Sequence, residues 1–133
     1  MCGILGVLGS YNKNQVESML SAQSHRGPDA VGTFYDDSIA LGHNRLSIID
    51  LSSDANQPLY SNDNRFVLVF NGEIYNYKEL KLILQESYQF KTQSDSEVLL
   101  AAFIKYGERC LEKLNGMFSF VIWDTKKKRT FCR

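Results

Sequence analysis

The sequence has no net charge, because its 15 lysine and arginine residues are balanced by 15 aspartate and glutamate residues. A chain without a positive excess lacks the long-range field that holds a polyanion or an acidic membrane surface. Long hydrophobic runs are also missing. The longest apolar stretches, residues 66–70 and 98–104, are far shorter than the roughly 20 residues that span a bilayer. The N-terminus lacks the basic start of a secretory signal. We therefore expect a cytoplasmic protein with no nucleic-acid and no membrane partner.

Cysteine and histidine are both scarce, with three cysteines and two histidines in the chain. An odd number of widely spaced cysteines does not form a disulfide framework. Two histidines without a Cys-x-x-Cys pair argue against zinc, so no metal site is expected. Cys110 and Cys132 lie in an amphipathic and an alternating stretch, where a small buried hydrophobic side chain is the expected role. Cys2 differs from both because it directly follows the initiator methionine.

The pattern of apolar and turn-forming residues predicts one domain over residues 1–133, since the chain is long enough for one core and too short for two. Apolar, β-branched and aromatic segments predict strands at residues 2–9, 31–35, 39–46, 66–70, 117–123 and 130–132. The asparagine–glycine pair at 71–72 predicts a turn after the fourth of these strands. The last strand looks unfinished, so we interpret the C-terminus as truncated.

Three helices are expected from capping signals and from helical spacing of apolar residues. Asn14 and Asn76 are the expected N-caps of the first two, each followed three residues later by glutamate. A Ser-x-x-Glu capping box at Ser94 begins the third, and Gly107 is its expected stop. The second helix is expected to bury Leu80, Ile83 and Leu84. Consecutive helices between groups of strands predict an α+β fold with helices covering antiparallel sheets.

Removal of Met1 would make Cys2 the first residue, with a thiol and a free α-amine on the same Cα atom. An α-amine is partly unprotonated near neutral pH and can accept the proton of a thiol, directly or through one water. One residue would then supply both nucleophile and base. Position alone favours a plainer interpretation, in which Cys2 is a small residue at the start of a strand. Retention of Met1 would turn the amine into an amide and remove the base.

Further motifs accompany the opening Cys2-Gly3-Ile4-Leu5-Gly6. They are His25-Arg26-Gly27-Pro28-Asp29, Arg45-Leu46-Ser47-Ile48-Ile49-Asp50, Gln57-Pro58-Leu59, Asn71-Gly72-Glu73-Ile74-Tyr75-Asn76, Ser94-Asp95-Ser96-Glu97 and Asn115-Gly116-Met117-Phe118. In this order and spacing they resemble the N-terminal glutaminase domain of asparagine synthetases, a class II, or type 2, glutamine amidotransferase. The resemblance covers nearly the whole chain. It implies the N-terminal-nucleophile (Ntn) hydrolase fold, an αββα sandwich of antiparallel sheets flanked by helices.

The resemblance also implies which residues bind glutamine. Arg45 would bind the α-carboxylate, for which a planar guanidinium offers two parallel hydrogen bonds. Asp95, together with Glu73, would bind the α-ammonium group, and the backbone carbonyl near Ile48 would accept part of it. Plainer interpretations exist for two of these residues. Arg45 could close a surface ion pair, and a carboxylate such as Asp95 is favoured in the first turn of a helix by the dipole alone.

The implied catalytic residues are Cys2 as nucleophile, with the side-chain amide of Asn71 and the backbone N–H of Gly72 as an oxyanion hole. Losing one oxyanion-hole donor typically slows a reaction by a factor of about 10² to 10³. The implied reaction hydrolyses glutamine to glutamate and ammonia through a thioester on Cys2. His25 is expected to have a structural role only.

The implied partners are glutamine and the synthetase domain of the same full-length chain, which would use the ammonia to make asparagine from aspartate. No cofactor is expected in this domain. ATP and Mg²⁺ would belong to the synthetase domain, and residues 1–133 contain no Ser-Gly-Gly pyrophosphate loop. Two alternatives stay open: the same glutaminase serving another acceptor, such as a sugar acid, and a non-catalytic docking domain. A homodimer is also left open.

Overall fold

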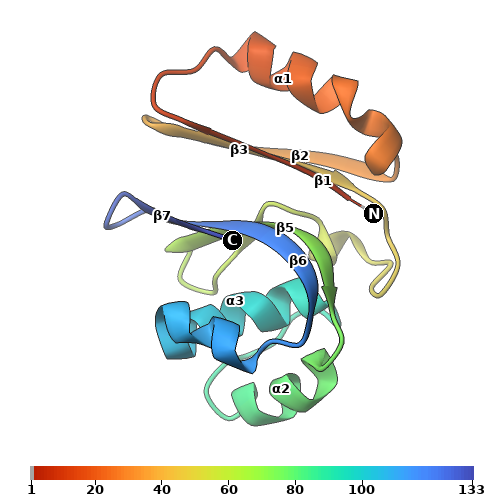
Figure 1. The fold of residues 1–133 in the computed structure, drawn as a ribbon, viewed down its shortest axis with the longest axis vertical. Coiled ribbons are helices and arrows are strands. Elements are labelled where there is room, and N and C mark those ends of the chain that lie inside the picture. Colours follow the sequence, from red (N-terminus) through yellow and green to blue (C-terminus); the bar gives the residue numbers. More distant parts are fainter. Residues whose placement is uncertain (1) are drawn as a thin grey trace.

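In the computed structural model, which describes residues 2–133, two antiparallel sheets pack face to face and helices cover both outer faces (Figure 1). The first sheet has the order β1-β3-β2, from β1 (Gly3–Leu8), β2 (Ala30–Asp36) and β3 (Ile39–Arg45). The second has the order β4-β5-β6-β7, from β4 (Leu59–Tyr60), β5 (Phe66–Ile74), β6 (Gly116–Asp124) and β7 (Arg129–Cys132). The expected α+β class and αββα arrangement are confirmed.

Three α-helices form the outer layers, with α1 (Lys13–Ala22) on the first sheet and α2 (Tyr77–Leu84) and α3 (Asp95–Tyr106) on the second (Figure 1). Short 3₁₀ turns occupy Ser24–Arg26, Ser53–Ala55 and Gly107–Lys113. Within residues 2–133, none of the helices has the length and apolar character needed to cross a membrane.

Alternation along the strands divides the core into layers. Ile39 and Leu41 of β3 pack between the sheets against Val67 and Val69 of β5. The intervening Ala40 points the other way and packs with α1. The opposite face of β5 packs on α2 and α3 in the largest cluster. Every residue of β3 is buried, because a helix covers one face and a sheet the other. The odd-numbered side chains of β3 therefore enter the space between the sheets.

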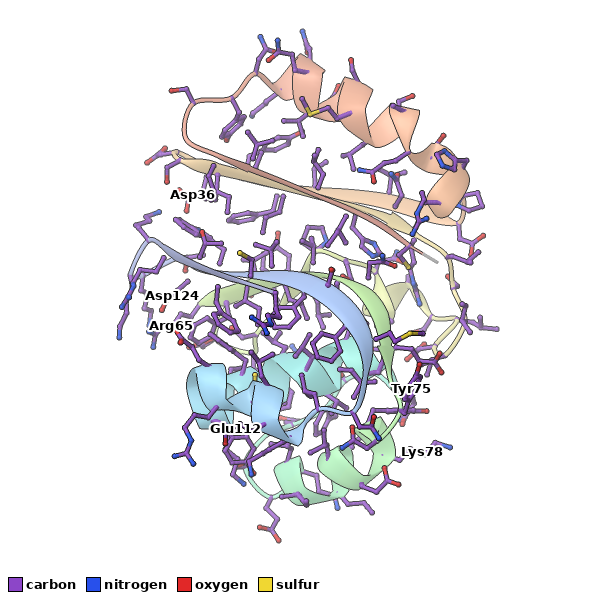
Figure 2. All side chains as sticks on the ribbon, in the orientation of Figure 1. Asp36, Arg65, Tyr75, Lys78, Glu112 and Asp124 are labelled. Atoms are coloured by element: carbon purple, nitrogen blue, oxygen red, sulfur yellow. The ribbon has the colours of Figure 1, made fainter. Side chains whose placement is uncertain are left out.

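Polar contacts fasten the two sheets at one end of the sandwich (Figure 2). Asp36, at the end of β2, accepts a hydrogen bond from Trp123 Nε1 of β6 at 3.0 Å and pairs with Lys128 Nζ at 2.7 Å. At the same end but within the second sheet, Arg65 pairs with Asp124 at 2.6 Å, and this guanidinium lowers the pKa of Asp124 to about 2. The N-terminus lies at the other end of the sandwich (Figure 1).

The first helix begins at a different cap from the one expected. Asn12 is the N-cap of α1, because its side-chain oxygen accepts from the N–H of Asn14 at 2.9 Å. Its backbone is extended, with φ of −112° and ψ of 126°, whereas Asn14 is already helical. The expected cap at Asn14 was therefore wrong by two residues. Helix α1 ends at Ala22, and Gln23 is its C-cap.

The second helix follows Asn76 as expected, but Asn76 does not cap it through its side chain. That side chain instead joins two distant segments, donating to Lys113 O and accepting from Asn115 N, both at 2.9 Å. The expected apolar face was also partly wrong. Leu80 and Leu84 are buried, but Ile83 is 52% exposed, because the core contacts only a narrow stripe of this short helix.

The third helix begins at Ser94, whose Oγ accepts from Glu97 N at 3.3 Å, so this cap is confirmed. The return bond of a capping box is not made. The Glu97 carboxylate instead accepts from Thr92 N at 2.7 Å, and Ser94 N donates to Thr92 Oγ1. Gly107 ends the helix with a φ of +60°, a region that favours glycine.

The largest difference from the sequence prediction concerns Asn71 and Gly72, which do not form a turn. Strand β5 continues through both residues to Ile74, with Asn71 opposite Ser119 and Gly72 opposite Phe118 of β6. Long-range pairing with β6 therefore overrides the local turn preference of the asparagine–glycine pair. As a consequence, both residues lie on a rigid strand rather than in a loop.

Candidate active site

A pocket of about 150 Å³ is bordered by the first sheet, the far half of β5 and the start of α3. Every candidate residue except Asn71 lines it: Cys2, Arg45, Ile48, Gly72, Glu73 and Asp95. Strand pairing explains part of this, because Gly3 lies opposite Asn44 and Cys2 is thereby held beside the end of β3. The half-buried Cys2 Sγ accepts a hydrogen bond from the N–H of Leu46 at 3.4 Å.

Arg45 brings a buried positive charge to the pocket, with only 7% of the residue exposed. Its guanidinium donates to Ser52 O at 2.7 Å, to Asn56 Oδ1 at 2.6 Å and to the backbone carbonyl of Asp50. The Asp50 carboxylate turns away and accepts from Gln93 N. None of the carboxylates in residues 2–133 forms an ion pair with Arg45. The surface ion pair considered for Arg45 is therefore not present, and part of its donor set is free for an anion.

Asp95 brings a buried negative charge to the same pocket, with 6% of the residue exposed. Its Oδ2 accepts from the N–H of Ile74 at 3.0 Å, and no cation of the described chain pairs with it. Burial raises the pKa of the Asp95 carboxyl, and the neighbouring charge of Glu73 adds to the effect. An ammonium group placed here would reverse this shift, because an opposite charge favours the ionised carboxylate.

The N–H groups of β5 explain why Gly72 can act as a hydrogen-bond donor. Tyr75 N donates to Asn115 O on the β6 side, so by strand alternation the N–H groups of even-numbered residues point away from β6. Strand β4 covers only the first part of β5. Beyond it, Phe70 N donates to Gln57 Oε1 and Ile74 N donates to Asp95. Gly72 N lies between these two, borders the pocket, and donates to none of the described side chains.

Gly72 is also required by close packing against β6. A Cβ atom at this position would collide with the carbonyl oxygen of Met117 and lie 2.6 Å from Phe118 Cα. The preceding residue, Asn71, points by alternation toward the first sheet, on the face that carries Val69. Asn71 does not line the pocket, and its buried Oδ1 has no hydrogen-bond partner among residues 2–133.

Two candidate residues lie at the pocket mouth rather than inside it. Ile48 is 70% exposed, and Glu73 is exposed on β5. Neither side chain makes a hydrogen bond in the described chain. The buried charges of the pocket are therefore those of Arg45 and Asp95. Glu73 adds negative charge near Asp95.

A sequence profile described as the glutamine amidotransferase domain matches residues 1–133 of this chain. The chain belongs to this family. Glutamine-hydrolyzing asparagine synthetase 1 of Bacillus subtilis strain 168 is 43% identical over 132 residues, covering 93% of this chain and 21% of the relative. Glutamine-hydrolyzing asparagine synthetase of Zea mays is 43% identical over 133 residues, covering 96% of this chain and 22% of the relative. This amidotransferase domain thus spans about a fifth of the length of these relatives.

A solved structure supports the fold of the amidotransferase domain. The glutamine phosphoribosylpyrophosphate amidotransferase of B. subtilis, complexed with ADP and GMP, superimposes with a TM-score of 0.78. The match covers 93% of this chain and 35% of that chain, at 23% identity. The N-terminal-nucleophile hydrolase fold expected from the sequence is therefore confirmed.

Two residues around the site have no role in the sequence prediction. Gln57 lines the pocket of the amidotransferase domain and accepts from Phe70 N at 2.6 Å. His43 is fully buried behind it, with Nε2 at 3.1 Å from Phe70 O. Gln57 belongs to a motif that carries the resemblance, which could have identified it. The residues around His43 in the sequence do not indicate its role, because its hydrogen-bond partner, Phe70, lies on the other sheet.

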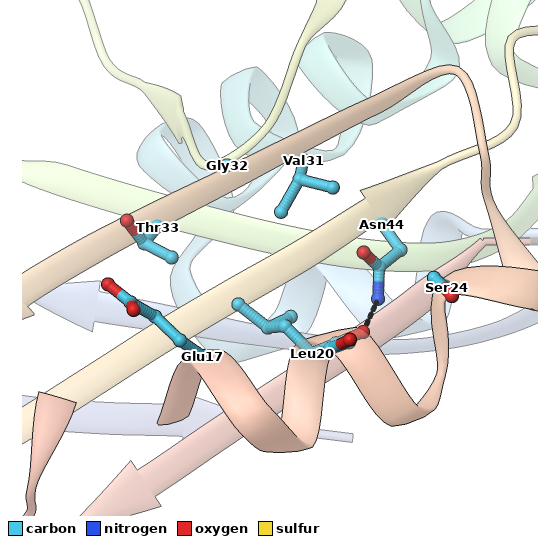
Figure 3. Close-up of a pocket in the computed structure, with 8 residues that line it drawn as sticks. Glu17, Leu20, Ser24, Val31, Gly32, Thr33 and Asn44 are labelled. Atoms are coloured by element: carbon cyan, nitrogen blue, oxygen red, sulfur yellow. Dashed lines mark hydrogen bonds between the residues drawn. The ribbon is translucent and has the colours of Figure 1, made fainter. Parts of the chain in front are cut away.

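A second, larger cavity of about 420 Å³ lies on the other side of the first sheet, next to α1 (Figure 3). It is lined by Glu17, Leu20, Ser21, Ser24, Val31, Gly32, Thr33 and Asn44. Asn44 donates there to Leu20 O at 2.9 Å (Figure 3). None of the candidate residues reaches this cavity, so the smaller pocket with Cys2 is the candidate active site.

Proposed function

We propose that this amidotransferase domain hydrolyses glutamine to glutamate and ammonia, with Cys2 as nucleophile after removal of Met1. The observation that carries this proposal is a pair of opposite, buried and unpaired charges, Arg45 and Asp95, in one small pocket with the Cys2 thiol. An unpaired buried charge is strongly unfavourable. A pocket that holds one of each sign suits a ligand with a carboxylate and an ammonium group on the same end, as a free α-amino acid has.

The bound amino acid is oriented by these two charges. Arg45 binds the α-carboxylate through the N–H groups that its three protein acceptors leave free. Asp95 binds the α-ammonium group, with Glu73 adding negative charge at the mouth and the backbone near Ile48 completing the contacts. The side-chain amide of glutamine then extends toward Cys2. Holding the α-carboxylate and the α-ammonium group in this way aligns the amide carbon with the thiol.

The first chemical step transfers the thiol proton of Cys2 to its own α-amine while sulfur bonds to the amide carbon of glutamine. The carbonyl electron pair moves onto oxygen, and the oxyanion accepts from Gly72 N–H and from the Asn71 side-chain amide. Collapse of this intermediate breaks the C–N bond, and the Cys2 ammonium group returns a proton to the departing nitrogen. Ammonia leaves, and a γ-glutamyl thioester remains on Cys2.

The second step hydrolyses the thioester. A water molecule gives a proton to the Cys2 α-amine and attacks the thioester carbon, and the same oxyanion hole holds the second tetrahedral intermediate. Breaking the C–S bond releases glutamate, and the sulfur recovers its proton. Asn71 and Gly72 therefore act twice in each turnover, which makes their positions decisive for kcat.

The ammonia serves a synthetase domain of the same full-length chain, as the names of the relatives suggest for those proteins. We place any requirement for ATP and Mg²⁺ in that domain and assign no cofactor to residues 1–133. Amidation of aspartate is the acceptor reaction we favour. A different acceptor, such as a sugar acid, is compatible with the same glutaminase site.

The test begins with an intact-mass measurement that establishes the loss of Met1. Glutamate and ammonia release are then measured for the processed protein, for Cys2→Ala and for the control Cys132→Ala, which alters an exposed cysteine on β7. We expect hydrolysis to disappear in Cys2→Ala and to persist in the control. An unchanged rate in folded, processed Cys2→Ala would refute the proposal. Failure of a glutamine-like electrophile to label Cys2 would favour a non-catalytic docking domain instead.

A further inference from the structure

The peptide groups of Phe70 are held in an unusual way, just before the two oxyanion-hole residues on β5. At this point β4 has ended and cannot supply a backbone partner. Phe70 N donates to the side-chain oxygen of Gln57 at 2.6 Å, and Phe70 O lies 3.1 Å from His43 Nε2. Two side chains, from β3 and from the segment before β4, thus replace a missing strand partner for one residue of β5.

Burying the ring of His43 costs stability, because only one of its two nitrogens has a hydrogen-bond partner. The residue is 0% exposed, and its Nδ1 has no hydrogen-bond partner among residues 2–133. A carbonyl oxygen can only accept, so Nε2 carries the proton that bonds to Phe70 and Nδ1 is a bare acceptor. Burial lowers the pKa of His43 to about 4, with the charge of Arg45 contributing, so the ring is neutral near pH 7. A buried acceptor without a hydrogen-bond partner destabilises a fold. A functional role of His43 would explain why this loss of stability is retained.

We propose that His43, assisted by Gln57, is a positioning residue that holds Phe70 so that the donor groups of Asn71 and Gly72 point at the oxyanion. The C=O of Phe70 and the N–H of Asn71 belong to the same peptide unit, so a bond to the carbonyl also fixes the plane in which Asn71 begins. The N–H of Gly72 lies on the same edge of β5 as the N–H and C=O of Phe70, two residues further along the strand. The inference rests on the proposed glutaminase function, because it concerns the geometry of that oxyanion hole.

His43 acts through its neighbours and not by contact with glutamine. It does not line the pocket, whereas the charges that bind the amino acid, Arg45 and Asp95, do. Removing the Nε2 donor should therefore leave substrate binding nearly intact. It should lower the rate of both tetrahedral steps, because the oxyanion donors lose their alignment.

The experiment compares His43→Leu, which removes the donor, with His43→Gln, whose amide restores a donor at a similar distance from the backbone. We expect His43→Leu to lower kcat about tenfold or more with KM within about threefold, and His43→Gln to recover most of kcat. Alkylation of Cys2 by iodoacetamide forms no oxyanion, so its rate should stay unchanged in both variants. His25→Gln, at an exposed histidine, is the matched control.

Several outcomes separate this inference from the proposed function. Absence of glutamine hydrolysis in the processed wild-type protein refutes the proposed function, and the inference falls with it. An active wild type with unchanged kcat in His43→Leu refutes the positioning role alone. Equal losses in both His43 variants, together with slower alkylation, indicate a purely structural role and also refute it. If His43→Leu does not fold, Gln57→Met provides the same comparison, with a lower kcat at unchanged KM as the expected result.

Discussion

The buried ring of His43 predicts a pH dependence of folding stability that can be calculated. Burial lowers its pKa from 6.5 to about 4. Between these values the unfolded chain binds a proton that the folded protein does not, so stability falls as pH falls. At about 1.4 kcal/mol per pKa unit, the loss from this group is about 2 kcal/mol between pH 7 and pH 5 and about 3 kcal/mol by pH 4. It levels off once the folded protein is protonated too.

The assay is urea unfolding of the wild type and of His43→Gln at pH 7, 6, 5 and 4, with the free energy of unfolding taken from each curve. Carboxylates titrate in both proteins, so the difference between the two curves isolates the ring. We expect this difference to change by about 3 kcal/mol over the range, in favour of the variant at low pH. The exposed His25 supplies the control, because His25→Gln should follow the wild type. Parallel curves for wild type and His43→Gln would refute the buried, neutral ring.

Three further predictions concern the pocket. Asp95→Asn should raise KM for glutamine at least about tenfold, which steady-state kinetics would measure. The same substitution should stabilise the unliganded protein at pH 7, because the buried carboxylate has a raised pKa and its charged form is disfavoured. Thermal melting would measure that gain in stability. Arg45→Lys should raise KM about 10- to 100-fold with a smaller effect on kcat, since an ammonium group cannot serve three protein acceptors and a carboxylate together. Gly72→Ala should lower the free energy of unfolding by about 2–4 kcal/mol, because the new Cβ atom would collide with Met117. Gly6→Ala is the control. Its Cβ atom would lie 3.7 Å from the nearest neighbour, so the free energy of unfolding should change by less than about 1 kcal/mol.

Local signals predicted much of the fold. The cap at Ser94 and the stop at Gly107 were both confirmed, because a serine oxygen and a glycine backbone act over a few residues. The strand predicted at residues 39–46 agrees closely with β3. Of the seven site residues that the resemblance implies, six line one pocket and Asn71 does not.

Long-range pairing accounts for what could not be predicted. The turn expected at Asn71 and Gly72 does not form, because β6 pairs with β5 through both residues. Ile83 has the spacing of a core residue but faces solvent, since the core that would cover it depends on where α2 docks. The role of Gln57 as a substitute for a strand partner depends on how short β4 is. None of these three features can be predicted from the residues that neighbour it in the sequence.

The choice between an enzyme and a docking domain turns on how the two buried charges are satisfied. Arg45 and Asp95 line the same pocket but do not pair with each other, and each is held by neutral groups of the backbone or of an amide side chain. A docking domain would gain stability by pairing them or by replacing both with apolar residues. Keeping them apart is favourable only when a ligand supplies a carboxylate to one and an ammonium group to the other. In the proposed mechanism that ligand lies against Cys2, so the same charges that lower stability would also position the amide for attack.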